Sequence, residues 1–214
     1  RLMLASQLQN MSLELASEVG DDADVTVYTQ DGQIYTADNR TRAINDARKS
    51  VYFDALNLNG VDVFCNKFKE FLKITNGIVL TGNFSPSPFV NDCRLVRKVV
   101  VRATENPEIA APGRVCEEVP DEIYMEVKTQ PGISSWEPSV TAPLFFYHDS
   151  GEIEILVSVN GAIVTLTEGE IDVIYLAEPI DSDLSTDTIE PYIMYPAIKD
   201  KAYELLLKLR QKNQ

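Results

Sequence analysis

Apolar side chains recur every three or four positions in several stretches of the chain, which is the repeat of one face of an α-helix. The most regular stretch runs from Tyr35 to Asn57. Its apolar stripe consists of Ile44, Ala47, Val51, Ala55 and Leu56. Its opposite face carries Arg40, Arg42, Asp46, Arg48 and Lys49. Thr36 or Asp38 can cap the first turn, and the sequence NLNG at 57–60 supplies the turn that ends the helix.

Three further stretches show the same helical repeat. The first ends at Gly20, a natural left-handed cap, and its stripe is Leu4, Leu8, Met11, Leu15 and Val19. The second, VDVFCNKFKEFLK at 61–73, places on one face Val61, Phe64, Phe68, Phe71 and Leu72. The third begins near Pro196, and its stripe is Ile198, Ala202, Leu205 and Leu209. The pattern predicts an N-terminal helical bundle and a C-terminal helix that packs back on it.

Segments rich in β-branched residues predict strands in the middle of the chain. They are GIVLTG at 77–82, RLVRKVVVRA at 94–103 and IYMEVKT at 123–129, with proline-containing loops between them. In the polar segment after the first helix, the Asp-Gly pair of QDGQ at 30–33 favours a short hairpin.

The strongest turn signals lie between Pro143 and Pro179. Asp149-Ser150-Gly151 and Asn160-Gly161 each separate two apolar runs, and Asn-Gly in this setting is typical of a two-residue hairpin. We therefore expect a meander of about four antiparallel strands. The order of helices, then sheet, then helix predicts an α+β fold. Its expected parts are a helical unit at 1–76, a β-rich meander or sandwich at 77–190, and a C-terminal helix at 191–214 that returns to the helical unit.

Acidic residues dominate the charge of this 214-residue chain, which has a formal net charge of −14. That charge argues against duplex DNA or an anionic membrane as the main partner. The sequence contains no apolar run long enough to predict a membrane span. From Asp149 to Glu190 there are eleven acidic residues and no Lys or Arg, whereas 192–214 carries five basic residues against two acids. This asymmetry is read as a solvated acidic face or as a dipolar surface by which copies or neighbours select one another.

Few residues have the types and spacings that catalysis or metal binding needs. The three cysteines, Cys65, Cys93 and Cys116, are too far apart for the close ligand pairs of a zinc site, and they are read as small buried apolar residues. The single histidine, His148, flanks a turn without a nucleophile signature to partner it, so a surface position is expected. TGNFSPSP lacks the lysine of a phosphate-binding loop, and DSDLSTD lacks the glycine of an EF-hand. We expect no cofactor and no metal.

Trp136, the sole tryptophan, lies in the loop sequence GISSWEPS. Large aromatic residues are usually well buried, so an anchor that fixes the loop on the sheet is favoured over an interface anchor. Carboxylates in the acidic stretch keep a hydrolase open as a further reading, because their separation in space decides that chemistry.

Several motifs together resemble the head-to-tail adaptor or neck-ring proteins of tailed bacteriophages. They are a helix, the polar connection DGQIYT, a second helix AINDARKSVYFDALN, a β-rich middle, and a final helix entered through EPYIMYPAIKDKAYELLLKL. The Asn-(Asp/Glu)-Ala core of that family's helix is matched by Asn45-Asp46-Ala47, and its strand and Pro-containing entry are matched by DVIYLAEP and YPAIKDKA. The β insertion from Ile78 to Pro179 is larger than in minimal helical adaptors, so a portal-proximal ring, a tail-proximal ring or another virion component all fit.

The resemblance implies a structural virion protein with no catalytic activity. It would be assembled in the bacterial cytoplasm into a homo-oligomeric, twelvefold ring that contacts the portal and neighbouring tail or neck proteins, and through which DNA passes without specific binding. Independently, separated acidic and basic surfaces suit contacts between identical subunits. The residues expected at such an interface are Arg40, Arg42, Arg48, Lys49, Trp136, Lys199 and Lys201. The alternative is a stand-alone β-rich module that binds protein or carbohydrate through the loop around Trp136.

Overall fold

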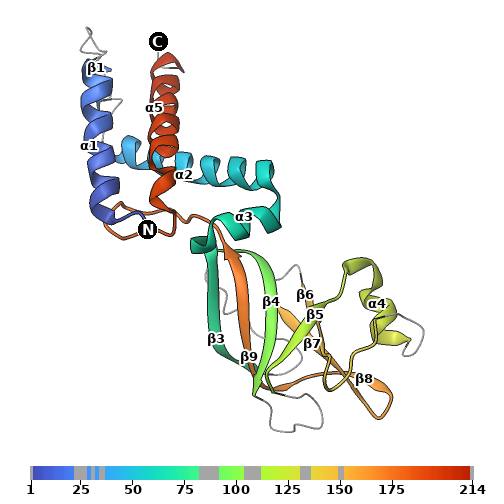
Figure 1. Ribbon diagram of the computed structural model, residues 1–214. Coiled ribbons are helices and arrows are strands. Elements are labelled where there is room, and N and C mark those ends of the chain that lie inside the picture. Colours follow the sequence, from blue (N-terminus) through green and yellow to red (C-terminus); the bar gives the residue numbers. More distant parts are fainter. Residues whose placement is uncertain are drawn as a thin grey trace. The chain divides into compact units, whose positions relative to one another are not determined.

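The computed structural model describes residues 2–21, 28–29, 32–33, 37–81, 92–103, 112–130, 136–148 and 152–212. The fold is mixed α+β, with helices near both ends of the chain, as predicted (Figure 1). The chain forms two compact units, one of Arg1–Phe71 with Glu178–Gln214 and one of Leu72–Ala177. The acidic segment 178–190, which was expected in the β-rich domain, thus belongs to the helical unit.

Three long helices build the helical unit: α1 (Ala5–Asp21), α2 (Ala37–Asn59) and α5 (Tyr195–Lys212). They pack against one another, and α2 continues past α5 toward α3 (Val61–Lys67) (Figure 1). Two single turns of 3₁₀-helix complete the unit, η1 (Lys69–Phe71) and η2 (Tyr192–Met194). The expected hairpin is present as β1 (Tyr28–Thr29) paired antiparallel with β2 (Gly32–Gln33); its central residues lie outside the described ones.

The predicted helical stripes are largely those that build the core. In α1 the buried residues include Leu8, Met11 and Leu15, and in α2 they include Ile44, Ala47 and Tyr52. The stripe predicted for α5 needs a correction, because Leu205 is only half-buried and Leu209 is 36% exposed. The buried residues follow a strict four-residue spacing instead. They are Met194, just before α5, and Ile198, Ala202 and Leu206 within it.

The stretch 61–73 is not one helix, as the sequence had predicted. The helix α3 ends at Lys67 because Phe68, with φ −124° and ψ 68°, leaves helical geometry, and the chain becomes a strand at Leu72. The aromatic residues at 64, 68 and 71 nevertheless converge. The Phe64 and Phe71 rings lie edge-on to Tyr52, with centroid separations of 5.3 and 5.0 Å. This aromatic cluster is the core beneath the C-terminal half of α2.

Seven strands form one curled, mostly antiparallel sheet in the β unit, in the order β3-β9-β4-β5-β6-β7-β8, with β5 and β6 parallel. Their bounds are β3 (Leu72–Thr81), β4 (Cys93–Ala103), β5 (Arg114–Glu118), β6 (Leu144–Tyr147), β7 (Ile153–Val159), β8 (Ala162–Thr165) and β9 (Glu168–Ala177). The four strands expected between 143 and 179 are present, but the meander ends at β8, because β9 pairs with β3 and β4 instead. Asn160 and Gly161 form the predicted turn with φ of 52° and 80°, and the turn expected at 149–151 lies outside the described residues.

The strand predicted at 123–129 is wrong, because this segment is the helix α4 (Asp121–Thr129). Its β-branched residues suggested a strand, but Ile123 and Val127 are spaced four apart and both face a core. Two acids, Asp121 and Glu122, lie in its first turn, and Lys128 lies in its last, which suits the helix dipole.

Two core clusters explain why β6 and β7 read as continuous apolar runs. The inner core cluster lies inside the curled sheet and includes Val99, Phe145, Ile155, Val157 and Val173. The α4 core cluster consists of Val119, Val127, Leu144, Phe146 and Leu156. Because β6 and β7 contribute alternate residues to each cluster, both of their faces are buried.

Candidate functional site

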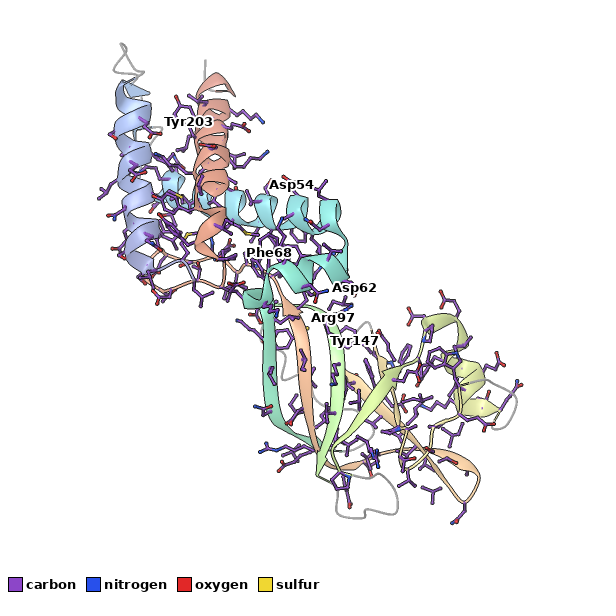
Figure 2. The ribbon with its side chains drawn as sticks, viewed as in Figure 1. Asp54, Asp62, Phe68, Arg97, Tyr147 and Tyr203 are labelled. Carbon is purple, nitrogen blue, oxygen red and sulfur yellow. The ribbon has the colours of Figure 1, made fainter. Side chains whose placement is uncertain are left out.

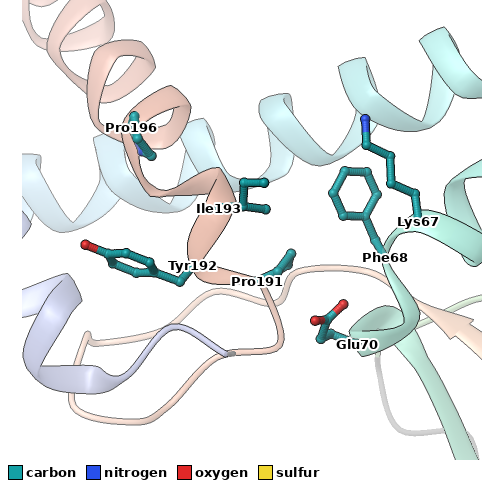
Figure 3. A pocket seen from close by; sticks show the side chains of 7 residues that line it. All are labelled: Lys67, Phe68, Glu70, Pro191, Tyr192, Ile193 and Pro196. Atoms are coloured by element: carbon teal, nitrogen blue, oxygen red, sulfur yellow. The ribbon is translucent and has the colours of Figure 1, made fainter.

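An apolar hollow of about 560 Å³ opens on the helical unit (Figure 3). One wall comes from the end of α3 and from η1, and the other comes from η2 and the first turn of α5. Its lining residues are Lys67, Phe68, Glu70, Pro191, Tyr192, Ile193 and Pro196. Lys67 and Glu70 carry the only charges of this lining, so the remaining surface is apolar or aromatic.

One wall of the hollow presents exposed apolar side chains from η2. Ile193 is 76% exposed and Tyr192 is 47% exposed, whereas Met194 is buried in the core. A 3₁₀ turn has three residues per turn, so the burial of Met194 directs its two predecessors away from the core. Single exposed apolar residues are common on proteins, but these two stand beside an open apolar hollow, which is typical of a contact surface.

The opposite wall of the hollow is the ring of Phe68. It packs in a tilted arrangement against Phe64 at a centroid separation of 5.0 Å, and the ammonium group of Lys67 lies 5.2 Å from the centroid of the Phe68 ring. Figure 3 shows the side chains of Lys67 and Glu70 pointing to opposite sides of this ring. This wall of the hollow is thus apolar, with a cation on one side and an anion on the other.

A buried ion pair fixes the segment that leads into η2. Arg48 on α2 is 2% exposed, and its guanidinium donates to both carboxylate oxygens of Glu190, at 2.7 and 3.2 Å. Glu190 precedes Pro191, and its carbonyl oxygen accepts a bond of 2.9 Å from the backbone N–H of Met3. A two-point Arg–carboxylate contact defines orientation as well as distance. This pair therefore determines where the η2 wall begins.

Asn45 extends the ion pair into a network. The Arg48 guanidinium donates to the side-chain oxygen of Asn45 at 2.7 Å. The Asn45 amide donates in turn to the carbonyl of Ser182 at 2.8 Å, and the N–H of Ser182 donates back to Asn45 at 3.2 Å. The buried guanidinium and amide are therefore hydrogen-bonded, as buried polar groups need to be.

A cluster of ionisable groups lies in the β unit, around Glu154 on β7. The Glu154 side chain is fully buried, and four neighbours reach its carboxylate. The hydroxyls of Tyr124 and Thr165 donate to it, Lys128 Nζ donates at 2.9 Å, and His148 Nε2 lies 3.3 Å away. Each carboxylate oxygen therefore has two partners.

These contacts keep Glu154 ionised. Burial acts to raise the pKa of Glu154, but hydrogen bonds from Thr165, Tyr124 and Lys128 outweigh burial and hold the pKa below its ordinary value. Burial together with the carboxylate raises the pKa of Tyr124. A carboxylate whose two oxygens are both fully hydrogen-bonded is better suited to hold α4 against the sheet than to transfer a proton. His148 lies inside this cluster and is half-buried, so the expectation of a surface position is corrected.

The residues expected at an interface are found in different settings. Arg48 is buried in its pair with Glu190, so it is not available on the surface of the chain, which corrects the prediction for the outer face of α2. Arg40 donates to the hydroxyl of Ser12 at 3.2 Å. Arg42 is exposed and lines a smaller hollow between α2 and α5.

The remaining expected residues also have partners within the chain. The Lys49 ammonium lies 2.8 Å from Asp181 and that of Lys201 lies 3.7 Å from Glu204. Lys199 bridges two acids of α1, Glu14 at 2.9 Å and Glu18 at 2.6 Å. Trp136 is half-buried and packs against the α4 core cluster, which agrees with a loop anchor.

The hollow contains residues that sequence reasoning did not single out. Phe68 was assigned to a helical stripe, and Ile193 fell within the predicted C-terminal helix but outside its apolar stripe, because periodicity identifies the residues that face a core. The sequence could have pointed to Ile193 only by exclusion. The buried stripe of this segment is the four-residue series Met194, Ile198, Ala202 and Leu206, and Ile193 lies outside it. An isoleucine that no stripe explains is a candidate contact residue.

Comparison with known proteins gives no identification, since the chain matches no family model and no curated protein. Among the described residues, no cluster of His, Cys, Asp and Glu could hold a metal ion. No described helix is long and apolar enough to cross a membrane.

Proposed function

We propose that this chain is a structural protein of a tailed-bacteriophage particle. Copies of it would join into a ring between portal and tail, where the chain acts by contact and catalyses no reaction. The observation that carries the proposal is the apolar hollow of the helical unit, with Ile193 exposed beside it. A surface of this kind favours burial against another polypeptide, because apolar area removed from water stabilises an interface.

The sequence resemblance supports the same function from a different direction. The motif Asn45-Asp46-Ala47 lies on α2, and two of its residues, Asn45 and Ala47, are buried in the helical unit. A motif that builds the packing of the helical unit is what a family of assembly proteins would share. Arg48, one residue later, completes the network that leads to the η2 wall.

The chemistry of the β unit also favours a non-catalytic role. A general acid or base needs a pKa near the working pH and access to a substrate. Glu154 has neither property, because its pKa is lowered and its side chain is fully buried among four partners.

The alternative of a protein- or carbohydrate-binding module rests on the loop around Trp136. That side chain packs against the α4 core cluster, so less of it is available to a ligand than in an exposed anchor. The hollow on the helical unit is the more accessible apolar surface, and it favours the ring.

Counting copies in particles tests the proposal. Tailed particles made from a genome that encodes this chain would be purified and analysed by quantitative mass spectrometry, with the portal protein as internal standard. We expect about as many copies of this chain as of the portal protein, because stacked rings of one symmetry share a subunit number. Absence of the chain from particles, or a ratio far below one, would contradict the proposal.

A further inference from the structure

Two polar side chains of α4 reach the same carboxylate of the sheet, that of Glu154 on β7. The Tyr124 hydroxyl and Lys128 Nζ both donate to it, and Lys128 Nζ also donates to the Tyr124 hydroxyl at 3.0 Å. Tyr124 and Lys128 are four positions apart, so they share one face of the helix. From the other side, Thr165 on β8 donates to this carboxylate, and His148, just after β6, lies 3.3 Å from it. Glu154 therefore joins α4 to β7, to β8 and to the end of β6.

The apolar anchoring of α4 is small and separate from the larger core of the β unit. Val127 is the one buried residue of the helix, and Ile123 and Tyr124 are half-buried against the α4 core cluster. No residue of α4 belongs to the inner core cluster. Tyr147, labelled in Figure 2, packs against the inner core cluster, whereas the ring of its neighbour Phe146 stacks on Tyr124. Detachment of α4 would thus leave the inner core cluster packed.

The helix α4 is too short to be stable without its contacts on the sheet. Isolated helices of fewer than about 12 residues are marginal in water. The nine residues of α4 also have no side-chain cap at their N-terminus. When α4 loses its anchor, we therefore expect it to unfold instead of persisting as a free helix. Local openings of this kind occur without global unfolding where few apolar contacts hold a segment.

The charge of Glu154 decides whether this anchor holds. Burial acts to raise the pKa of Glu154, but hydrogen bonds from Thr165, Tyr124 and Lys128 hold it below the ordinary value of 4.5. The contacts are therefore at full strength above pH 4.5 and weaken as the pH falls through the lower pKa of the folded chain. A proton on the carboxylate also removes the anion that faces Lys128 and His148. A histidine is charged in this pH range, so two cations are then left near each other.

We propose that Glu154 acts as an acid-sensitive latch for α4. When its carboxylate takes up a proton, α4 leaves the sheet and unfolds, while the inner core cluster keeps the sheet folded. Release uncovers the apolar sheet face formed by Leu144, Phe146 and Leu156. The latch belongs to the β unit alone and does not depend on the proposed function. It assigns the first step of acid unfolding in this unit to one helix.

Hydrogen–deuterium exchange of the full-length chain, measured by mass spectrometry, would test the latch. Protection factors, which are corrected for the intrinsic dependence of exchange on pH, would be followed from neutral pH to about pH 3. We expect the protection of 121–129 to fall by about fivefold for each charge-assisted hydrogen bond that becomes a neutral one. The strands β4 and β9, which contribute to the inner core cluster, should keep their protection over the same range.

Glu154→Gln retains nearly the shape of the side chain and does not titrate. We expect α4 to be less protected in this variant than in wild type at neutral pH, with no further loss in acid. Glu126→Gln removes an exposed carboxylate from the same helix and is the matched control, so it should keep the pH dependence of wild type. Circular dichroism would verify that both variants are folded.

Tyr124→Phe tests the latch without altering the buried carboxylate itself, and it serves if Glu154→Gln does not fold. It removes one hydrogen bond to Glu154 and retains the ring that stacks on Phe146. The protection of α4 should fall at neutral pH by about tenfold, the factor expected for one hydrogen bond to a charged group. The latch would be overturned if α4 and the strands lost protection together, if acid left α4 unaffected, or if Glu154→Gln kept the full pH dependence of wild type.

Discussion

At the scale of single residues, Arg48 and Glu190 are the charged pair on which the helical unit depends most. Both side chains are almost completely removed from water, and each is the partner that compensates the other's charge. A buried ion pair adds little over a well-packed apolar pair, but removal of one partner leaves a buried charge without compensation. The free energy that a single substitution changes is therefore the cost of leaving one of these charges buried without its partner.

We expect Arg48→Met to lower the free energy of unfolding of the helical unit by about 3–5 kcal/mol, because Glu190 loses the guanidinium that compensates it. Urea unfolding followed by circular dichroism at a helix wavelength would measure the change. Lys49→Met is the control one residue away, since its pair with Asp181 is exposed on both sides, and it should cost less than about 1 kcal/mol. Equal losses in the two variants would contradict the central role of the buried pair.

In the β unit, Glu154 is the buried charged residue that corresponds to the Arg48–Glu190 pair. Its carboxylate joins α4, through Tyr124 and Lys128, to β8, through Thr165. The lowered pKa of Glu154 means that the folded chain holds this proton less tightly than the unfolded chain does. The resulting stability is present above the ordinary pKa of 4.5 and is lost as the pH falls through the lower value of the folded chain.

Acid should therefore destabilise the β unit below about pH 4.5, and Glu154→Gln should show a weaker dependence on pH in that range. At neutral pH the same variant should lose about 1–3 kcal/mol, because charge-assisted hydrogen bonds become neutral ones. Trp136 packs against the α4 core cluster, so its fluorescence during urea unfolding at each pH reports on this region. Glu168→Gln, an exposed position, is the control, and an unchanged pH profile in Glu154→Gln would contradict the assignment.

At the scale of elements, strand β3 contains an irregularity that depends on Gly77. The register against β9 shifts between Thr75 and Ile78, and Gly77 lies there with φ of +67°. Its N–H donates to the Asp172 carboxylate at 2.8 Å, and an added Cβ would lie 2.6 Å from the Arg102 guanidinium. Both the backbone conformation and the space around this position favour glycine.

We expect Gly77→Ala to lower the free energy of unfolding of the β unit by about 1–2 kcal/mol from the left-handed backbone alone. A further loss should stay below about 1 kcal/mol, because only the flexible, exposed end of Arg102 must move and its contacts with Glu170 and Asp172 are long and accessible to solvent. Gly113→Ala isolates the backbone contribution, since Gly113 has φ of +76° and open space around it. Urea unfolding followed by Trp136 fluorescence would compare them, and a smaller loss for Gly77→Ala than for Gly113→Ala would contradict this account.

The elements that sequence predicts well are those in which local periodicity and burial agree. Helices α1 and α2 and the Asn160-Gly161 turn are in this class, because their signals are contained within a few residues. Helix α4 was missed because its β-branched composition competes with the four-residue spacing of Ile123 and Val127, whose common buried face depends on the α4 core cluster. The pairing of β9 with β3 and β4 depends on contacts far apart in the chain, which periodicity cannot supply.

The candidate site was harder to predict than the fold. The interface was expected from charged residues, and Arg48 and Lys49 proved to have partners within the chain. The hollow is built from segments more than a hundred residues apart, near Phe68 and near Ile193, and an exposed apolar residue has no sequence periodicity of its own.

At the scale of the whole molecule, the formal net charge of −14 sets how the chain behaves toward nucleic acid. Basic residues are present, but Lys49, Lys199 and Lys201 pair with acids of the same chain. Binding to a phosphate backbone needs an excess of cations on the contacting face. A ring of such chains would form a channel that DNA could traverse without being held.

We therefore expect no measurable affinity of the purified chain for duplex DNA at physiological salt. Fluorescence anisotropy of a labelled duplex, titrated with the chain over a range of salt concentrations, would measure this property. A variant in which exposed acids such as Glu168 and Glu117 become lysine serves as a comparison, since it should bind more tightly. Strong binding by the wild-type chain that weakens steeply with salt would contradict the channel hypothesis.

The helical unit is made from the two ends of the chain, with the β unit inserted between them. During synthesis on a ribosome, the guanidinium of Arg48 is made long before Glu190, and the face of α2 that α5 covers stays uncovered until α5 has been translated. A product that ends before Glu190 would retain an uncompensated cation and an uncovered apolar face. The unit that carries the hollow can therefore be completed only after the β unit and α5 have been synthesised.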